Sequence, residues 1–175
     1  PSQHVFVNRG GILPRKPPSI SSTDSEHSWI MPKDIVAGDI IKESNWIVET
    51  AVAEHVQPYL DSIAYKISFN NFSIVFTGDT QPCESVTKLA ENADIMVCMC
   101  WDDQESMDKY QESTGQCSAE GAAKMAKDAN VKKLILSHMG KHISTHGILE
   151  NALGNAAKIY DGEIIFAEEL MKIQF

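Results

Sequence analysis

The pentapeptide Phe76-Thr77-Gly78-Asp79-Thr80 carries the strongest structural signal in this sequence. It overlaps the end of segment 73–77, whose apolar residues are typical of a buried strand. It therefore places a carboxylate directly after that strand. Gly78 permits a close backbone approach here, because glycine has no Cβ. We therefore expect Asp79 at the edge of a sheet.

Two histidines stand at comparable strand ends. His55 follows the alternating polar and apolar residues of 46–53, and His138 follows the apolar segment 132–137. Two imidazoles and a carboxylate suit a divalent cation such as Zn²⁺, with Mn²⁺ or Fe as alternatives. Composition alone does not show that the three side chains converge, and a single histidine is more often an ordinary residue than a ligand.

The pattern of the whole chain predicts an α/β (α+β) fold, in which a mixed sheet is flanked by helices. Hairpin-linked strands come first, and strands alternate with helices afterwards. The predicted strands are 46–53, 62–68, 73–77, 94–100, 132–137 and 163–167, and the predicted helices are 82–92, 104–112, 118–129 and 145–160. Residues 1–45, with their glycines, prolines and a polar serine-rich run, predict an irregular arm or linker, so that the folded domain is 46–175.

The composition is that of an ordinary globular protein, with 43% hydrophobic and 22% charged residues. The net charge of −9 argues against a broad basic surface for nucleic acid. No apolar run reaches the roughly 18 residues that a membrane helix needs. The four cysteines lack the CxxC spacing of a zinc ribbon and predict buried, reduced thiols. Because no signal peptide is evident, they also favour a cytoplasmic location.

Taken in order, these motifs resemble the metallo-β-lactamase superfamily, in its ribonuclease Z and arylsulfatase-like branch. The segment 76–80 looks like the family's Gly-Asp-Thr motif, whose aspartate bridges two metal ions. The stretch His55-Val-Gln-Pro-Tyr-Leu-Asp-Ser-Ile-Ala-Tyr-Lys-Ile looks like the loop whose histidine binds one metal. Leu134-Ile-Leu-Ser-His138 looks like the strand end whose histidine binds the other, and the resemblance covers residues 46 to 175.

The resemblance implies a specific chemistry. His55, Asp79 and His138 would be metal ligands, and Asp79 would also serve catalysis by bridging two zinc ions. A metal-bound hydroxide would attack an ester, lactone, phosphoester or sulfate-ester centre, because bound metals lower the pKa of water. Such a protein is a metal-dependent hydrolase, and we expect it to act on a small-molecule substrate.

The superfamily's His-x-His-x-Asp-His motif is missing from this sequence. The six histidines are at positions 4, 27, 55, 138, 142 and 146, and no two are separated by a single residue. Because the family places that motif upstream of His55, the chain resembles a C-terminal half, with half of an αββα sandwich. We expect the upstream half of the same protein, or a second chain, to supply the missing ligands. The exposed sheet face would be covered by that partner or within a homo-oligomer.

Two alternatives to this reading remain open: a noncatalytic or truncated protein, and a ribonuclease Z-like nuclease. Against the nuclease, the family's acidic relay residue falls on Met99, and Gln116 stands where relatives carry a histidine. The long basic insertion with which those relatives grip tRNA has no counterpart. Gln116 and Tyr59 are candidate substrate-binding residues, since an amide can donate a hydrogen bond and Tyr59 lies near His55.

Weaker signals surround these residues. His142 and His146 follow His138 at helical intervals, but the glycine and polar residues between them disfavour a continuous helix, so a ligand role is not expected. Asp102 and Asp103 follow a buried strand and could form hydrogen bonds near the site, although acids in a loop are more often solvated.

Overall fold

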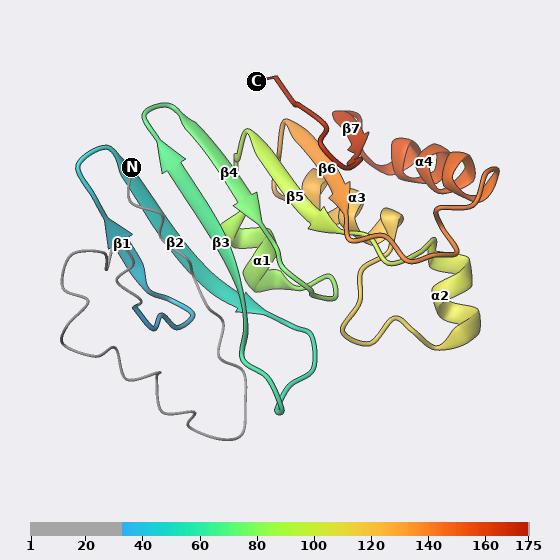
Figure 1. Ribbon diagram of the computed structural model, residues 1–175, viewed down its shortest axis with the longest axis horizontal. Helices are drawn as coiled ribbons and strands as arrows, with labels where there is room; N and C mark the ends of the chain where they lie inside the picture. The colour runs from blue at the N-terminus through green and yellow to red at the C-terminus, as the bar shows by residue number, and fades with distance from the viewer. Residues whose placement is uncertain (1–32, 175) are drawn as a thin grey trace, which may run out of the picture.

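A computed structural model describes residues 33–174 and shows one mixed sheet of seven strands (Figure 1). The strands are β1 Ile40–Lys42, β2 Trp46–Ala53, β3 Ser62–Phe69, β4 Phe72–Phe76, β5 Ile95–Met99, β6 Lys133–Ser137 and β7 Glu163–Phe166. They lie side by side in the order of the sequence. Neighbours from β1 to β4 are antiparallel, and neighbours from β4 to β7 are parallel.

Four helices belong to this part of the chain: α1 Glu84–Leu89, α2 Gln104–Tyr110, α3 Ala119–Asp128 and α4 Ile148–Ile159. Helix α1 contacts β2 and β3, α3 contacts β5 and β6, and α4 packs on α3. Figure 1 shows α1 and α3 behind the sheet, on the same face. Each connection between parallel strands contains a helix, because the chain must return to the other end of the sheet before the next strand can pair in parallel.

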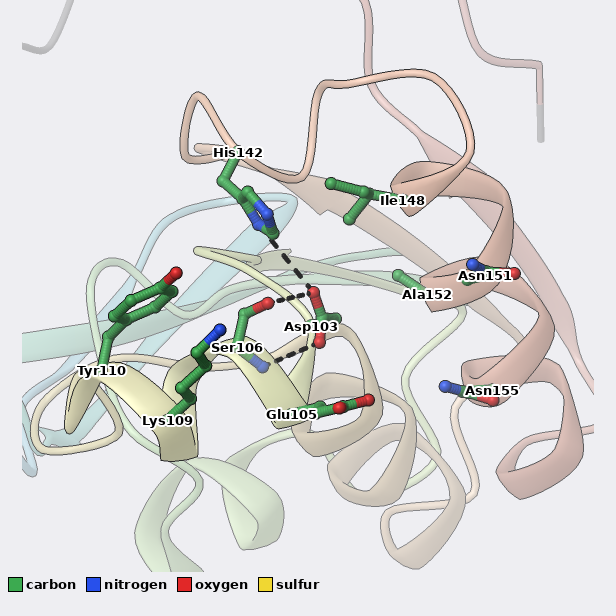
Figure 2. Close-up of a pocket in the computed structure, with 10 residues that line it drawn as sticks. All are labelled: Asp103, Glu105, Ser106, Lys109, Tyr110, His142, Ile148, Asn151, Ala152 and Asn155. Atoms are coloured by element: carbon green, nitrogen blue, oxygen red, sulfur yellow. Dashed lines mark hydrogen bonds and ion pairs between the residues drawn. The ribbon is translucent and has the colours of Figure 1, made fainter.

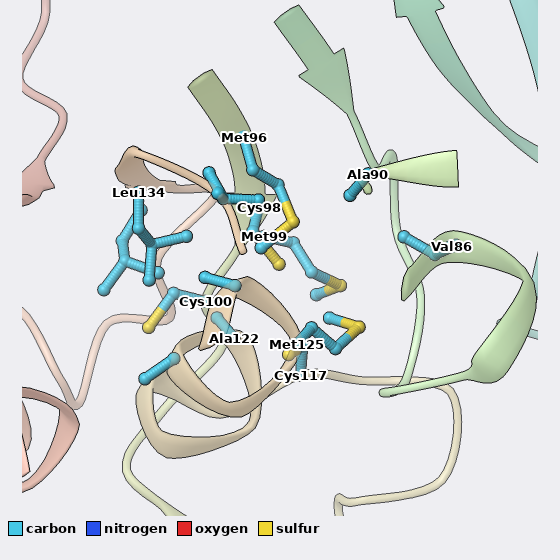
Figure 3. Close-up of a cluster of buried hydrophobic side chains, with 14 of the residues drawn as sticks. Val86, Ala90, Met96, Cys98, Met99, Cys100, Cys117, Ala122, Met125 and Leu134 are labelled. Carbon is cyan, nitrogen blue, oxygen red and sulfur yellow. The ribbon is translucent and has the colours of Figure 1, made fainter. Parts of the chain in front are cut away.

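The core lies between the sheet and these helices (Figure 3). Alternate strand residues point into it, among them Val75, Met96 and Leu134, each fully buried. Helix α3 presents Ala122 and Met125 to the same core, and its several alanines let the helix approach the sheet closely. Strand β5 is almost entirely buried, as expected for a continuous apolar run in a parallel sheet.

The opposite face of the sheet is apolar, and no helix of residues 33–174 covers it. We call this the bare face and define it by Val52, Ile63, Ile67, Ile74, Phe76, Val97 and Ile165. It is not open throughout, because Val48, Ile95 and Ile135 on the same face are only 2–5% exposed. Val52 is 46% exposed and Phe76 is 40% exposed. Their sequence neighbours Ala53 and Val75 point to the other side and are buried in the helix-side core. One layer of helices and one sheet thus form half of the expected αββα sandwich.

The strand directions gather one set of loops at a single edge of the sheet. Strands β2, β4, β5 and β6 all run the same way, since β3 is antiparallel to both β2 and β4. Their C-terminal ends therefore meet at one edge, which is where His55, Asp79 and His138 follow β2, β4 and β6.

The strands and helices predicted from 46 onward are all present, with ends that shift by up to a few residues. Helix α1 begins at Glu84 rather than 82, and α4 begins at Ile148 rather than 145. The predicted arm 1–45 is wrong in its last part, because β1 lies there and pairs with β2 through Ile40, Ile41 and Lys42. The prediction for residues 1–32 lies outside the described part of the chain. Among residues 33–174, no helix is both long and apolar enough to span a membrane.

Candidate metal centre

Asp79 lies between the two histidines that the sequence pairs with it. Its Oδ1 is 3.3 Å from Nε2 of His138, and its Oδ2 is 4.0 Å from Nε2 of His55. The carboxylate is 40% exposed, so solvent and ions can reach it. The structure thus brings the three predicted ligands together, with one histidine at each carboxylate oxygen.

At these distances His55, Asp79 and His138 would be able to hold a divalent cation. Ligand atoms about 2.1 Å from a tetrahedral zinc ion lie about 3.4 Å from each other. The contact between His138 and Asp79 has this spacing, at 3.3 Å, and the contact between His55 and Asp79 is somewhat longer, at 4.0 Å. Imidazole nitrogen and carboxylate oxygen are also ligand types that zinc prefers. That the residues act as ligands stays a prediction.

The orientation of His55 is fixed by hydrogen bonds that involve two other loops, those of Gly115 and Gln81. Nδ1 of His55 lies 2.7 Å from the carbonyl oxygen of Gly115, so a proton on Nδ1 leaves the Nε2 lone pair toward Asp79. The amide of Gly115 in turn donates to Oε1 of Gln81 at 2.9 Å. Gln81 is fixed on Glu54 by two bonds, from its backbone N–H at 2.7 Å and from its Nε2 at 2.8 Å.

Gly115 is required at this point by close packing. A Cβ at position 115 would lie 2.1 Å from the carbonyl oxygen of His55, and the glycine has a φ of +75°. Both conditions exclude other residues without a shift of the backbone. The contact between the loops at 55 and 115 is therefore a fixed feature of the site.

The threonines of the Gly-Asp-Thr region hold its backbone. Thr77 and Thr80 are fully buried, and the Thr80 hydroxyl accepts a hydrogen bond from the backbone N–H of Glu54 at 2.9 Å. The N–H of Thr80 donates to the sulfur of Met99 at 3.0 Å. Met99 thus packs under the metal motif, and its thioether has no proton to give.

The two predicted substrate-binding residues lie differently. Gln116 follows Gly115, and its Oε1 is buried without a hydrogen-bond partner, which leaves an acceptor for a ligand or water. Tyr59 is 77% exposed in the loop after His55. Contact of either residue with a substrate stays a prediction.

Asp102, Asp103 and His142 form a second polar group that sequence reasoning did not expect. Their ligand atoms all lie within 4.8 Å of one another. Nδ1 of His142 is 3.0 Å and 2.9 Å from the two oxygens of Asp102, a carboxylate that is only 5% exposed. The hydrogen bond to Asp102 raises the pKa of His142 above its ordinary value.

Asp103, which lies at the N-terminus of α2, is the third member of this group. Burial opposes its ionisation, but hydrogen bonds from the N–H and the hydroxyl of Ser106 prevail and lower the pKa of Asp103. The same bonds make it the N-cap of α2. In the sequence, only the acids after β5 and the histidine four residues beyond His138 pointed to this group.

The four cysteines are free and buried, as predicted. Burial raises the pKa of the Cys100 thiol strongly. The pKa of the Cys117 thiol is raised by its hydrogen bond with Cys98 and by burial. Neutral thiols are poor nucleophiles, so Cys100 and Cys117 serve packing in the core (Figure 3).

Comparison with known proteins agrees with this geometry. A family model described as a β-lactamase superfamily domain matches residues 39–139. Ribonuclease Z of Methanothermobacter thermautotrophicus is 44% identical over 80 residues, which are 45% of this chain and 26% of that protein. Ribonuclease Z of Archaeoglobus fulgidus is 37% identical over 101 residues, which are 58% of this chain and 32% of that protein. The chain thus spans 26% and 32% of the length of these two relatives.

Solved structures share the fold. The metallo-β-lactamase fold protein YhfI from Bacillus subtilis superposes with a TM-score of 0.67 at 20% identity, over 81% of this chain and 55% of that one. Zn²⁺-bound PqqB from Methylobacterium extorquens superposes with a TM-score of 0.59 at 9% identity, over 90% of this chain and 63% of that one.

The chain belongs to the metallo-β-lactamase superfamily. Over part of its length the chain is similar to proteins named ribonuclease Z.

Proposed function

We propose that this chain is part of a metal-dependent hydrolase that cleaves phosphodiesters. The observation that carries the proposal is the place of Asp79 between His55 and His138, with an imidazole nitrogen at each of its oxygens. The relatives named ribonuclease Z support a phosphodiester among the ester classes that such a site could attack.

The residues of this chain would hold the reacting groups in place. Zinc ions bound at the site would lower the pKa of water and stabilise the charge that develops on the phosphoryl oxygens. Asp79 would span the two positions, and Gly115 would keep His55 turned toward it. Gln116, with its unpartnered Oε1, would accept a hydrogen bond from the substrate or its water.

Three ligands are too few for two ions, because each structural or catalytic zinc takes about four or five ligands. We infer that a segment outside residues 33–174 supplies the others. That segment is the upstream half of the same protein or a second chain, and the bare face is the surface on which it would pack. A homo-oligomer would cover the same face.

Metal content tests the first part of this proposal. Zinc bound per molecule of the intact protein, measured by atomic emission after dialysis, should fall in Asp79→Ala, because the bridging carboxylate is lost. Asp161→Ala is the matched control, since Asp161 is exposed in the turn after α4 and should not change zinc content. Wild-type protein that holds no zinc, manganese or iron contradicts the proposal and favours the noncatalytic alternative.

Substrate choice tests the second part. We expect the zinc-loaded protein to hydrolyse bis(p-nitrophenyl) phosphate, a small diester, and to lose this activity in Asp79→Ala. The net charge of −9 and the replacement of a histidine by Gln116 favour a small substrate over RNA. No hydrolysis by a zinc-loaded protein would exclude the phosphodiester class.

A ribonuclease Z-like nuclease is the second candidate, favoured by the 44% identity to such an enzyme. It predicts cleavage of a precursor tRNA at its 3′ end, which an end-labelled transcript would show. Cleavage of the small diester without cleavage of the transcript would decide for the small substrate.

The four buried thiols fit a reducing compartment, and we infer a cytoplasmic location, which a fluorescent fusion would check.

A further inference from the structure

Hydrolysis of a phosphodiester whose leaving group is an alkoxide, such as a sugar oxygen, needs a proton for the departing oxygen, and the predicted metal centre offers no donor for it. Met99 carries no proton, and the Gln116 amide does not ionise near neutral pH. His55 and His138 are expected to bind metal through their nitrogens. Among the histidines of residues 33–174, two remain, His142 and His146.

His142 has the surroundings of a proton donor. Asp102, 5% exposed, holds Nδ1 of His142 with both oxygens, which orients the ring and leaves Nε2 free. The backbone of Asp102 is itself fixed, because its carbonyl accepts the N–H of Ala119 at 3.1 Å. The imidazole is 48% exposed, so its outer nitrogen is accessible. By contrast His146 is 95% exposed, with only Glu150 beside it.

A cavity of about 420 Å³ lies beside His142, and one of its walls, Trp101, contacts the predicted ligand His138. Trp101, Tyr110, Lys141 and His142 line it, together with Asp102, Glu112 and Gly140. The Trp101 ring forms the shared wall, since its edge-on contact with the ring of His138 has a centroid distance of 6.3 Å. Its Nε1 donates to Glu112 at 2.9 Å, which fixes the indole.

Gly140 and Trp101 line this cavity from two different loops, and the glycine allows the two backbones to approach closely. The N–H of Gly140 donates to the carbonyl oxygen of Trp101 at 2.8 Å, and a Cβ on Gly140 would lie 2.5 Å from that oxygen. The loop that carries His142 therefore lies directly against the residue that contacts His138. An aromatic wall beside the metal ligand suits a flat leaving group such as a base or an aryl ring.

We propose that this cavity binds the leaving group of the phosphodiester and that His142, held by Asp102, donates the proton to the departing oxygen. The inference rests on the proposed function. As the water oxygen bonds to phosphorus and the bond to the leaving oxygen breaks, that oxygen takes the proton from Nε2 of His142. The neutral imidazole then regains a proton from solvent.

The charged groups around His142 favour this cycle. Asp102 and Asp103 stabilise the protonated ring, and Lys109 opposes it more weakly. Lys141 and Glu112, which carry opposite charges, line the same cavity as His142. In the neighbouring cavity, His142 lies opposite α2, with Lys109 and Tyr110 (Figure 2).

A comparison of leaving groups tests the inference on the intact, zinc-loaded protein. Nitrophenolate departs without a proton, whereas the sugar hydroxyl of a dinucleoside phosphate needs one. His142→Gln should therefore lower kcat for the dinucleoside phosphate by about 10²–10⁴-fold, the usual contribution of a general acid, and change kcat for bis(p-nitrophenyl) phosphate by less than about fivefold. His146→Gln is the matched control and should leave both rates unchanged.

Each outcome of this comparison decides a different claim. Equal losses on both diesters, or no loss on either, overturn the role of His142 and leave the proposed function standing. A wild-type protein that cleaves neither diester overturns the proposed function, and the inference with it.

Proton titration of the His142 ring by ¹H–¹⁵N NMR gives a readout independent of turnover. Asp102→Asn should lower the pKa of His142 and move the high-pH fall of dinucleoside phosphate cleavage to lower pH by the same amount, because the donor must be protonated. An unchanged pH profile in a variant whose ring pKa has moved would overturn the proton transfer.

Discussion

The orientation of His55 depends on Gln81, a half-buried glutamine that has no hydrogen bond to it. Gln81 accepts the N–H of Gly115, and the Gly115 carbonyl meets Nδ1 of His55. Such outer hydrogen bonds fix which ring nitrogen carries the proton and so make the other a better ligand. A residue two positions beyond Asp79 thereby determines how well a ligand on another strand binds metal.

Replacement of this glutamine should weaken metal binding without unfolding the protein. We expect Gln81→Ala to lower zinc affinity by about 10–100-fold, because the Gly115 loop loses its anchor and His55 its fixed tautomer. Competition with a chromophoric chelator measures the affinity. Gln174→Ala is the control, since Gln174 is exposed and far along the chain, and equal affinity in the two variants would contradict the relay.

The pairing of His142 with Asp102 should make stability depend on pH. The folded-state pKa of His142 is raised, so its contribution is complete below the unfolded pKa of about 6.5 and is lost as pH rises through the folded value. Tm of wild type should exceed Tm of His142→Gln at pH 5, and the difference should shrink above neutrality. A difference that grows with pH would contradict the pair.

The residues of the metal centre could be predicted because each follows its strand directly. His55, Asp79 and His138 each lie one to three positions beyond a recognisable strand, and strand direction then brings them together. The pair of Asp102 and His142 could not be predicted, since it spans 40 residues and depends on two loops whose path no local pattern specifies.

Among the elements, α3 shows how a single side chain can cap a helix and tie it to a neighbouring helix. Ser118 is 1% exposed, accepts the N–H of Gly121 at 2.8 Å, and donates to Gln104 at 2.6 Å. It therefore caps α3 and ties it to the start of α2. Helix α1 has no such bond at its N-cap, Cys83, and it is the shorter helix.

Loss of this cap should destabilise the protein. Ser118→Ala should reduce the free energy of unfolding by about 1–2 kcal/mol, because one N–H of α3 loses its partner. Urea denaturation measures the change. Ser44→Ala, in the exposed loop before β2, should have an effect near zero, and equal effects at the two positions would exclude capping as the cause.

Strong local patterns predicted most elements, and pairing determined the others. Strands β5 and β6 are continuous apolar runs, so their place was evident from sequence. Strand β1 has three residues and forms only because β2 offers an edge, which its own residues do not reveal. The early start predicted for α1 followed Pro82, but the helix begins after Cys83.

At the scale of the molecule, the two faces of the sheet differ in what they meet. The helix face has a packed core, whereas the bare face exposes Val52 and Phe76 to the extent of 46% and 40%. Soluble proteins rarely leave a broad apolar surface open to water. The face should therefore be covered in the intact protein or its oligomer.

A charge on the bare face distinguishes a covered surface from an open one. If the face is covered, Phe76→Arg should destabilise the intact protein by about 3 kcal/mol or more, since a buried aromatic side chain is lost and a charge takes its place. If it is open, the change should stay within about 1 kcal/mol. Calorimetry measures it, with Leu170→Arg as a control at a residue that is 92% exposed.

The meeting of four strand ends at one edge couples metal supply to the integrity of the fold. Ligands after β2, β4 and β6 lie far apart in sequence, so bound ions would add to the hydrogen bonds, such as those between Glu54 and Gln81, that join the segments at that edge. By mass action, each tenfold rise of free metal above its Kd would add about 1.4 kcal/mol to stability. Chelation should open this edge first, and a protease added to metal-starved protein should cut the loop at 54–61 before it reaches the helix-side core.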